Sequence, residues 1–381
     1  MKSNKVCAIV GNYLEYKDLE DLVKKRSLAS LPFDGKYRLI DFQLSSLVNA
    51  NIRQVFLALH DYQIPSLLDH IGSGKEWGLD TITNRYFMGF YELFREQKGK
   101  DYCEHLLDFL RKSRSEITVY TTSSAVTNID LKPFIDLHRK NGRNISTLYK
   151  KIDSQHLSRE RDILSVNEEK QIVEGVHHFD PEVDRDEKLN FGIGIYIINT
   201  DWLIDFIEKN VNNDMESFVL ALALPKIIAQ EKTGVYEYIG YLKPIHDVKS
   251  YYDANMDMLD SHKFNALLYS NNRIFTKVKN EVPTYFARGS KVKKSQFASG
   301  SVIEGTVKNS IISRNNIVDA GSVIEDSIIF PHGKIKSGAK IRYAILDKNV
   351  VIEKNVTVSG TKDKPLVIQK HSVIKESIIS E

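Results

Sequence analysis

The sequence predicts an α/β domain with a Rossmann-like, mostly parallel sheet, followed by a parallel β-helix built from hexapeptide repeats. Two observations support this fold class. Apolar strand-like runs alternate with helical patterns over residues 1–262, and an aliphatic residue then recurs every six positions. Strand–helix alternation is typical of a parallel sheet covered by helices. We therefore assign residues 1–262 to the α/β domain, 263–285 to a linker and 286–381 to the β-helix.

The elements of the α/β domain follow from apolar patterning. Strands are expected at Val6–Val10, Gln54–Leu59, Ile117–Thr121, Ile145–Tyr149, Asp162–Val166 and Gly194–Ile198. Helices are expected at Arg38–Ala50, Ile64–Ile71, Cys103–Leu110 and Leu131–Lys140. The last helix meets Asn141-Gly142, a common C-terminal stop. In sheets of this kind, ligands bind at the carboxyl ends of the strands.

The C-terminal region has a different period. The spacing of six connects Ile311, Ile317, Val323, Ile329, Ile335 and Ile341. A three-sided parallel β-helix explains this period, whereas an ordinary β-sandwich, the alternative, does not. We expect these side chains to point inward, with Gly and Asn at corners that need a positive φ. The repeat is interrupted near Asp347 and resumes at Val350 and Val356, which predicts a longer turn there.

Composition limits the classes of function. Hydrophobic residues make up 42% of the 381 residues and charged residues 27%, while the net charge is only +3. This balance is typical of a soluble globular protein and argues against nucleic acid as a partner. Cys7 and Cys103 lack the spacing of a metal site or disulfide framework, so we expect buried, reduced thiols. No apolar run suits a signal peptide or a membrane span, so we expect no membrane partner and a cytoplasmic location.

Three segments carry a family resemblance. They are LPFDGKYRLIDFQLSSLVNANI (31–52), HDYQIPSLLDHIGSGKEWGLD (60–80) and YYDANMDMLD (251–260). With the hexapeptide repeats, they resemble bacterial ADP-glucose pyrophosphorylase, also called glucose-1-phosphate adenylyltransferase. The resemblance implies a nucleotidyltransferase domain and a left-handed β-helix. Family members form tetramers and convert ATP and glucose 1-phosphate to ADP-glucose and pyrophosphate in glycogen biosynthesis, using Mg²⁺.

The phosphate-binding loop of that family is not preserved. Active members follow the first strand with a loop resembling GGxGTRL, in which glycines admit the triphosphate and Arg neutralises it. This chain has GNYLEYKD at residues 11–18, so bulky Tyr13 and Tyr16 and acidic Glu15 occupy that place. A carboxylate at this position repels phosphate.

The other catalytic positions also differ. Leu28 stands where the family has a Lys near the phosphates. Ser124 and Pro244 replace two aspartates that hold Mg²⁺, and neutral side chains are poor ligands for a hard cation. His177 and His178 occupy the place of a Glu-Lys pair that meets the sugar phosphate. The resemblance therefore predicts no catalytic residues and no metal site.

The chain is consequently most similar to the GlgD-type, non-catalytic subunit that accompanies an active GlgC-type subunit. The resemblance implies a regulatory pseudo-enzyme without a cofactor of its own, in a hetero-oligomer whose catalytic partner uses Mg²⁺. It also implies a phosphorylated metabolite as effector, bound by basic residues between the two domains. The matching positions are Lys25, Arg26, Arg38 and Arg342, although lone surface charges are often simply solvated.

Two alternatives remain at this point. A catalytically competent, divergent nucleotidyltransferase would have to hold Mg²⁺ with Asp247, Glu15 and Asp101. A hexapeptide-repeat acyltransferase or scaffold would rely on His332 or His371, which we instead expect at solvated corners.

Overall fold

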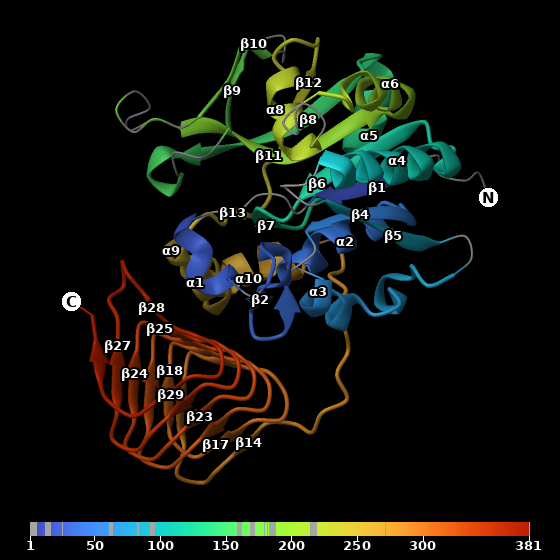
Figure 1. The fold of residues 1–381 in the computed structure, drawn as a ribbon. Helices are drawn as coiled ribbons and strands as arrows, with labels where there is room; N and C mark the ends of the chain where they lie inside the picture. The colour runs from blue at the N-terminus through green and yellow to red at the C-terminus, as the bar shows by residue number, and fades with distance from the viewer. Residues whose placement is uncertain are drawn as a thin grey trace.

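The computed structural model describes residues 6–11, 17–24, 26–60, 64–81, 84–91, 96–157, 162–167, 172–178, 180, 182, 188–213, 219–270 and 272–380. The α/β domain lies at one end of the molecule and the β-helix at the other, with a layer of short helices between them (Figure 1). Both predicted parts of the fold are confirmed.

The sheet of the α/β domain is parallel at its centre. Its strands are ordered β10-β9-β11-β6-β1-β4-β5, and β8 and β12 continue from β11. β1 is parallel to β4 and β6, whereas β11 is antiparallel to β6. The bounds are β1 Val6–Gly11, β4 Gln54–His60, β5 Arg85–Tyr91, β6 Ile117–Thr122, β8 Ile145–Asp153, β9 Asp162–Val166, β10 Ile172–His178, β11 Lys188–Asn199 and β12 Gly234–Glu237.

Helices cover both faces of this sheet. One face packs against α2 (Leu39–Asn49), α3 (Ile64–Ile71) and α5 (Lys132–Asn141). The other packs against α4 (Glu96–Ser113), α6 (Thr200–Asn210) and α8 (Leu220–Ile227). Successive residues of β1 alternate between these two cores, as a strand covered on both sides requires. The four predicted helices are therefore confirmed in position, while β5, β10, β12, α6 and α8 were not anticipated.

Short elements lie on the side of the α/β domain that faces the β-helix. They are η1 (Lys17–Leu19), α1 (Glu20–Val23), η2 (Leu28–Ser30), α9 (Val248–Met256), η6 (Asp257–Leu259) and α10 (Ser261–Leu268). A small hairpin, β2 (Pro32–Phe33) with β3 (Tyr37–Arg38), and a two-stranded antiparallel sheet, β7 (Ala125–Thr127) with β13 (Leu242–Pro244), join them. Helix η4 (Lys75–Trp77) and helix η5 (Ser154–His156) complete the domain.

The β-helix has three flat parallel sheets. The first contains β14 Tyr285–Phe286, β17 Val302–Ile303, β20 Ile317–Val318, β23 Lys334–Ile335, β26 Val351–Ile352 and β29 Val373–Ile374. The second contains β15 Lys291–Lys293, β18 Thr306–Lys308, β21 Val323–Glu325, β24 Lys340–Arg342, β27 Thr357–Ser359 and β30 Ile378–Ile379. The third contains β16 Gln296–Phe297, β19 Ile311–Ile312, β22 Ile328–Ile329, β25 Ala344–Leu346 and β28 Leu366–Ile368.

The strict period of six is wrong in detail. Ile312 stacks on Ile329, which stacks on Leu346, so one coil takes 17 residues and the inward steps run six, six and five. The predicted inward residue Ile317 is 41% exposed, and its neighbour Val318 is buried instead. Ile311 is buried too, although on the outside of the helix, under the α/β domain. One of the three steps in each coil takes five residues instead of six. The inward positions therefore shift relative to a strict period of six.

The turn predicted near Asp347 is also misplaced. Asp347 follows Leu346 at an ordinary corner, and the interruption was one of the regular five-residue steps. The extra residues lie between β27 and β28, at 360–365. Val350 and Val356 are buried as expected. Positive φ occurs at corner Asn and Gly residues, as predicted, and also at His332 and His371, which are exposed.

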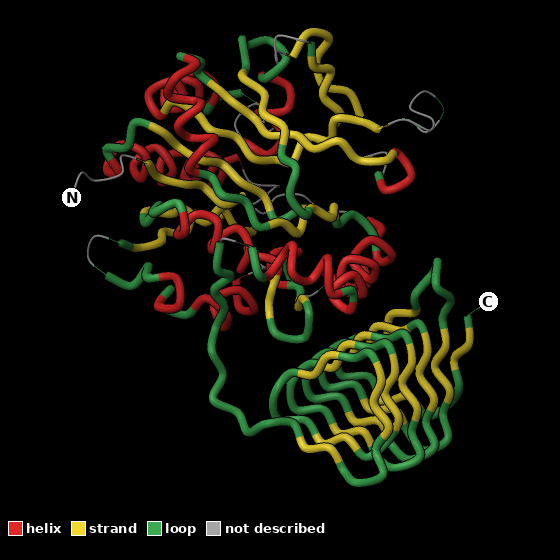
Figure 2. The backbone as a smooth tube through the Cα atoms, turned by 180° about the vertical axis from the view of Figure 1, so that it is seen from behind, coloured by secondary structure: helices red, strands yellow, loops and turns green. Residues whose placement is uncertain are grey.

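The third sheet docks on the α/β domain. Ile311, Ile328 and Ile345 project outward from three successive coils, yet at most 1% of each is exposed. They belong to one apolar cluster with Phe33 and Tyr251 of the α/β domain. The expected boundary at residue 262 falls inside α10, and an extended segment from 272 to 284 then leads into the β-helix (Figure 2).

Within the described residues, no helix is long and apolar enough to cross a membrane.

Candidate functional site

The carboxyl ends of the parallel strands meet at one edge of the sheet, where the family chemistry was expected. β1 ends at Gly11, and a Cβ atom on this residue would lie only 2.1 Å from the hydroxyl oxygen of Tyr120. Tyr120 is almost fully buried and packs near Tyr196, with ring centroids 6.1 Å apart. A tyrosine therefore fills the space beside the strand end. Tyr13, Glu15 and Tyr16 lie outside the described residues.

The structure brings Ser124 and Pro244 together. Pro244 pairs with Ala125 in the two-stranded β7–β13 sheet, and the backbone N–H of Ile245 donates to the carbonyl oxygen of Ser124 at 2.8 Å. The two positions are thus neighbours. The hydroxyls of Ser124 and Thr122 share a hydrogen bond of 2.9 Å, and both are buried. Neither position offers a carboxylate.

The carboxylates of the competing metal hypothesis are placed differently. Asp247 is the N-cap of α9, where its side chain accepts a hydrogen bond of 2.6 Å from the backbone N–H of Ser250. This role fixes the carboxylate at the helix start. Asp101 is exposed on α4, and Glu15 lies outside the described residues. Among the residues that the structure describes, no three His, Cys, Asp or Glu side chains gather as a metal site requires.

The structure describes the side chain of only one of the remaining expected positions, Leu28. Leu28 belongs to the apolar cluster of Leu22, Phe42 and Tyr251, so its side chain is part of a core. His177 and His178 lie on β10, paired with β9, and the structure describes only their backbone.

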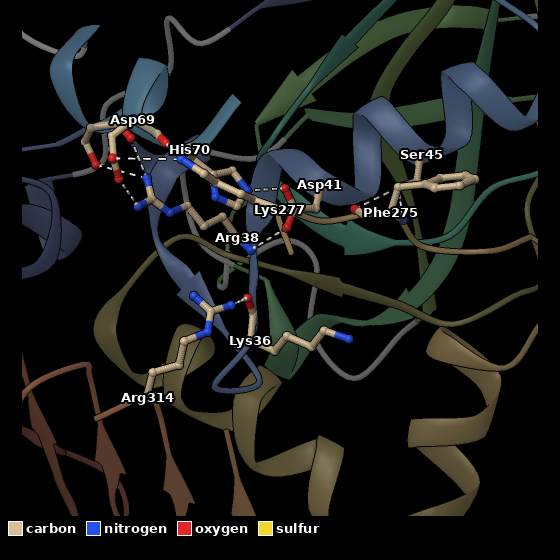
Figure 3. Close-up of polar contacts among 10 residues, drawn as sticks. Lys36, Arg38, Asp41, Ser45, Asp69, His70, Phe275, Lys277 and Arg314 are labelled. Carbon is tan, nitrogen blue, oxygen red and sulfur yellow. Dashed lines mark hydrogen bonds and ion pairs between the residues drawn. The ribbon is translucent and has the colours of Figure 1, made fainter. Parts of the chain in front are cut away.

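The interface of the two domains carries the basic groups. Arg38 begins α2, and its guanidinium donates to the carbonyl oxygen of Ser66 at 2.5 Å and lies 3.6 Å from Asp69. Arg314 comes from the β-helix and donates to the carbonyl oxygen of Lys36, in the β2–β3 hairpin, at 3.1 Å (Figure 3). The hairpin that contains Arg38 therefore also contacts an arginine of the β-helix.

A buried pair supports the start of α2. Asp41 accepts a hydrogen bond from the backbone N–H of Arg38 at 2.9 Å, and its other oxygen lies 2.5 Å from Nε2 of His70 (Figure 3). Burial lowers the pKa of His70, although the hydrogen bond to Asp41 opposes this change. Asp41 thereby fixes both the backbone of Arg38 and the ring of His70.

Arg26 and Lys348 meet at the same interface. Arg26 forms a buried salt bridge with Asp347 of the β-helix. The next residue, Lys348, is partly buried, and burial together with the charges of Arg38 and Arg26 lowers its pKa to about 8. Because the charged form of Lys348 is poorly stabilised here, an anion bound beside it would be favourable.

A cavity of about 160 Å³ lies at this interface, beside Arg38 and Lys348. Residues of both domains and of the extended segment line it, among them Arg38, His70, Lys277, Lys279, Arg314, His332 and Lys348, with Asp69 and Glu281 as the acids. Of this set, sequence reasoning assigned only Arg38 to an effector site, and it named His332 only for the acyltransferase alternative. Lys277 and Lys279 could have been noticed as a basic pair just before the β-helix, and Lys348 as a cation beside a corner.

The other expected effector residues are placed less favourably. Arg26 is occupied by Asp347, and neither it nor Arg342 lines the cavity. Arg342 is exposed on the second sheet of the β-helix, 4.0 Å from Asp326 and over the ring of Tyr343. Lys25 lies outside the described residues.

Fold and site together define a nucleotidyl transferase domain joined to a hexapeptide β-helix. The nucleotidyl transferase family matches residues 17–261, and the GlmU-like C-terminal hexapeptide family matches residues 282–380. A glycogen biosynthesis protein GlgD of Geobacillus stearothermophilus is 30% identical over 401 aligned positions, covering 99% of each chain. GlgD of Bacillus subtilis (strain 168) is 28% identical over 379 positions and covers 97% of each chain.

Adenylyltransferases show a similar level of identity. A glucose-1-phosphate adenylyltransferase of Bacillus cereus is 30% identical over 338 positions, covering 86% of this chain and 87% of the relative. The chain therefore belongs to the glucose-1-phosphate adenylyltransferase family of nucleotidyl transferases.

Proposed function

We propose that this chain is a non-catalytic, regulatory subunit of glucose-1-phosphate adenylyltransferase in glycogen biosynthesis. It associates in the cytoplasm with a catalytic subunit as a hetero-oligomer, a tetramer in our proposal. The catalytic partner binds Mg²⁺ and forms ADP-glucose, and this chain changes the response of that partner to a phosphorylated metabolite.

The sheet edge carries this proposal. Mg²⁺ binds hard oxygen ligands, preferably carboxylates, and phosphoryl transfer depends on such charge neutralisation. The adjoining positions Ser124 and Pro244 are neutral, and Leu28 is part of an apolar core. Asp247, which a divergent enzyme would recruit, caps α9 instead. These replacements are grouped on the elements where catalysis would occur, while the sheet around them is intact.

The interdomain cavity supports a regulatory role. Arg38 of the α/β domain and Arg314 of the β-helix line the same cavity, and Lys348 adds a partly desolvated cation. Charge-assisted hydrogen bonds to phosphate would join groups of both domains. An anion bound there therefore couples to the relative position of the domains. The acyltransferase alternative gains no support, because His332 and His371 sit exposed at corners with positive φ.

Reconstitution with a catalytic subunit tests the proposal. The pure chain should form no ADP-glucose with ATP, glucose 1-phosphate and Mg²⁺. Added to a catalytic glucose-1-phosphate adenylyltransferase subunit, it should copurify and change the rate or the activation by a hexose bisphosphate. Turnover by the pure chain, or an unchanged response after mixing, would contradict the proposal.

Matched variants separate regulation from assembly. Lys348→Met should copurify with the catalytic subunit but weaken the activation by the hexose bisphosphate. Lys112→Met, on the exposed surface of α4, should behave like the unmodified chain. Equal effects of both replacements would show that the response follows net charge alone.

A further inference from the structure

A second, larger cavity lies on the other side of the β2–β3 hairpin. Its volume is about 740 Å³, within the range of small-molecule sites. The hairpin, α10, the extended segment and the first two coils of the β-helix form its walls. It shares Lys36, Lys277, Lys279 and Arg314 with the smaller cavity, but Arg38 and Lys348 line only the smaller one.

The larger cavity is strongly cationic. Its lining includes five basic side chains, Lys36, Arg273, Lys277, Lys279 and Arg314, and a single acidic one, Asp34. Lys277 lies 4.0 Å from Asp69 and Arg314 lies 3.6 Å from Glu281. Of the other three, Lys36 interacts electrostatically with Asp34, whereas Lys279 and Arg273 form no salt bridge with the described residues; Lys36 and Arg273 lie over the rings of Tyr37 and Phe275. Unneutralised cations around a concave space attract an anion such as phosphate.

Asp34 is the unusual group in this lining. Its side chain is only 8% exposed, and its Oδ1 atom has no hydrogen-bond partner among the described residues. Burial raises its pKa well above the usual range, although the positive charge of Lys36 opposes this change. A buried polar atom without a partner is destabilising. Asp34 also lines the cavity, so a ligand there would lie beside this residue.

The local backbone does not require an aspartate. Asp34 and Gly35 have φ values of 50° and 67°, which Gly and Asn also adopt readily. The turn therefore forms without a carboxyl group at this position.

Aromatic rings complete the walls. Phe264, Tyr269 and Phe297 line the cavity, and the rings of Phe264 and Tyr269 are 5.7 Å apart. Tyr269 is 75% exposed, although aromatic side chains are usually buried. Exposed aromatic rings beside a cationic surface form a stacking platform for a planar ring with phosphates attached.

We propose that this cavity binds a nucleoside phosphate. The base stacks on the aromatic wall near Tyr269, Asp34 forms a hydrogen bond with the base or the ribose, and the lysines bind the phosphates. This site is separate from the sheet edge at Gly11, and the proposal does not depend on the regulatory function proposed above.

Calorimetric titration of the full chain tests the site, with ADP, adenosine and inorganic pyrophosphate as probes. ADP should bind at least tenfold more tightly than either fragment, because only ADP engages both the aromatic wall and the lysines. Equal affinity for ADP and pyrophosphate would overturn the proposal and show general anion binding by the basic surface.

Variants of the hairpin locate the ligand. Asp34→Gly should keep the fold, since glycine suits the turn, but weaken ADP binding about tenfold or more. Asp34→Asn should stay within about threefold, because the amide still donates and accepts. Tyr269→Ala should weaken ADP binding about tenfold. Unchanged affinity in both Asp34→Gly and Tyr269→Ala would place the nucleotide elsewhere and overturn the proposal.

A control variant keeps this proposal apart from the regulatory one. Lys348→Met should retain ADP binding while it loses sensitivity to a hexose bisphosphate, because Lys348 lines only the smaller cavity. Loss of ADP binding in this variant would contradict a separate nucleotide site.

Discussion

Arg26 and Asp347 form a salt bridge that joins the α/β domain to the β-helix across 321 residues of sequence. Their side chains are only 6% and 3% exposed. Burying two charges is costly, and the pair stays favourable only while both partners are present. This salt bridge therefore makes the domain interface sensitive to either residue.

Loss of one partner of this salt bridge should be severe. Arg26→Met should lower the free energy of unfolding by about 3–5 kcal/mol, because Asp347 would remain buried without its partner. Arg26→Met with Asp347→Leu should recover most of this loss. Urea unfolding measures both. The exposed pair of Arg111 and Glu208 is the control, and Arg111→Met should cost at most about 1 kcal/mol. Equal losses in Arg26→Met and Arg111→Met would refute the prediction.

The register of the β-helix predicts opposite results at neighbouring residues. Ile317→Glu should change stability by less than about 0.5 kcal/mol, because Ile317 faces outward and its partner in the next coil is Lys334, an opposite charge. Val318→Lys should unfold the β-helix, because it places a charge in the apolar column. Circular dichroism and thermal melting distinguish the two. A stable Val318→Lys protein would show that the register is wrong.

Anion binding in the smaller cavity should weaken as pH rises from 7 to 9. Lys348, with its pKa lowered to about 8, loses its charge in this range, and a charge-assisted hydrogen bond is lost with it. Between pH 7 and 9, the affinity of the unmodified chain for a hexose bisphosphate should fall several-fold more than that of Lys348→Arg, because the guanidinium of the arginine stays charged. Titration calorimetry at both pH values measures this. Parallel pH profiles of the two proteins would contradict the role of Lys348.

The same residue predicts a pH dependence of stability without ligand. Because the pKa of Lys348 falls from 10.5 to about 8 on folding, the unfolded state binds more protons between these values. Stability from this group therefore rises with pH across that window, and its charged form destabilises the protein below pH 8. Lys348→Met should raise the free energy of unfolding at pH 7 by at most about 3 kcal/mol. A decrease at pH 7, measured by urea unfolding, would show that the sign is wrong.

The crowded end of β1 makes a further prediction. Gly11→Ala should destabilise the protein by about 1–3 kcal/mol, because the new methyl group meets the ring of Tyr120. Tyr120→Ala should make room, so the double variant should lose less than the two single losses combined. Thermal melting of the three proteins measures this coupling. Strictly additive losses would show that the two side chains do not compete for space.

The sequence was sufficient to predict the order of those helices and strands that a local pattern of apolar residues defines. Apolar runs located β1 and β9, and helical spacing located α3. The β-helix was recognisable from spacing, but the exposure of Ile317 was not. Two adjacent aliphatic residues at each strand satisfy a period of six equally well, and only pairing between coils shows which one points inward.

The site was less accessible to sequence reasoning. Ser124 and Pro244 were named through the family motif, and the structure places them side by side at the β7–β13 sheet. Lys348 and Arg314 were missed because their proximity to Arg38 depends on how the domains dock. The salt bridge of Arg26 with Asp347 depends on the same docking, which no local pattern encodes.

The coil of 17 residues limits how this protein can change length. An insertion or deletion inside the β-helix keeps every face in place if it forms a loop at a corner, as at residues 360–365, or if it adds or removes one whole coil. A change by one coil would move all later residues by one strand spacing, about 4.8 Å. Asp347 and Lys348 would then be displaced from Arg26 and Arg38 as a unit. The number of coils before Asp347 therefore fixes where this residue lies relative to the α/β domain. Selection on the domain interface then acts on the number of coils as well as on the residues.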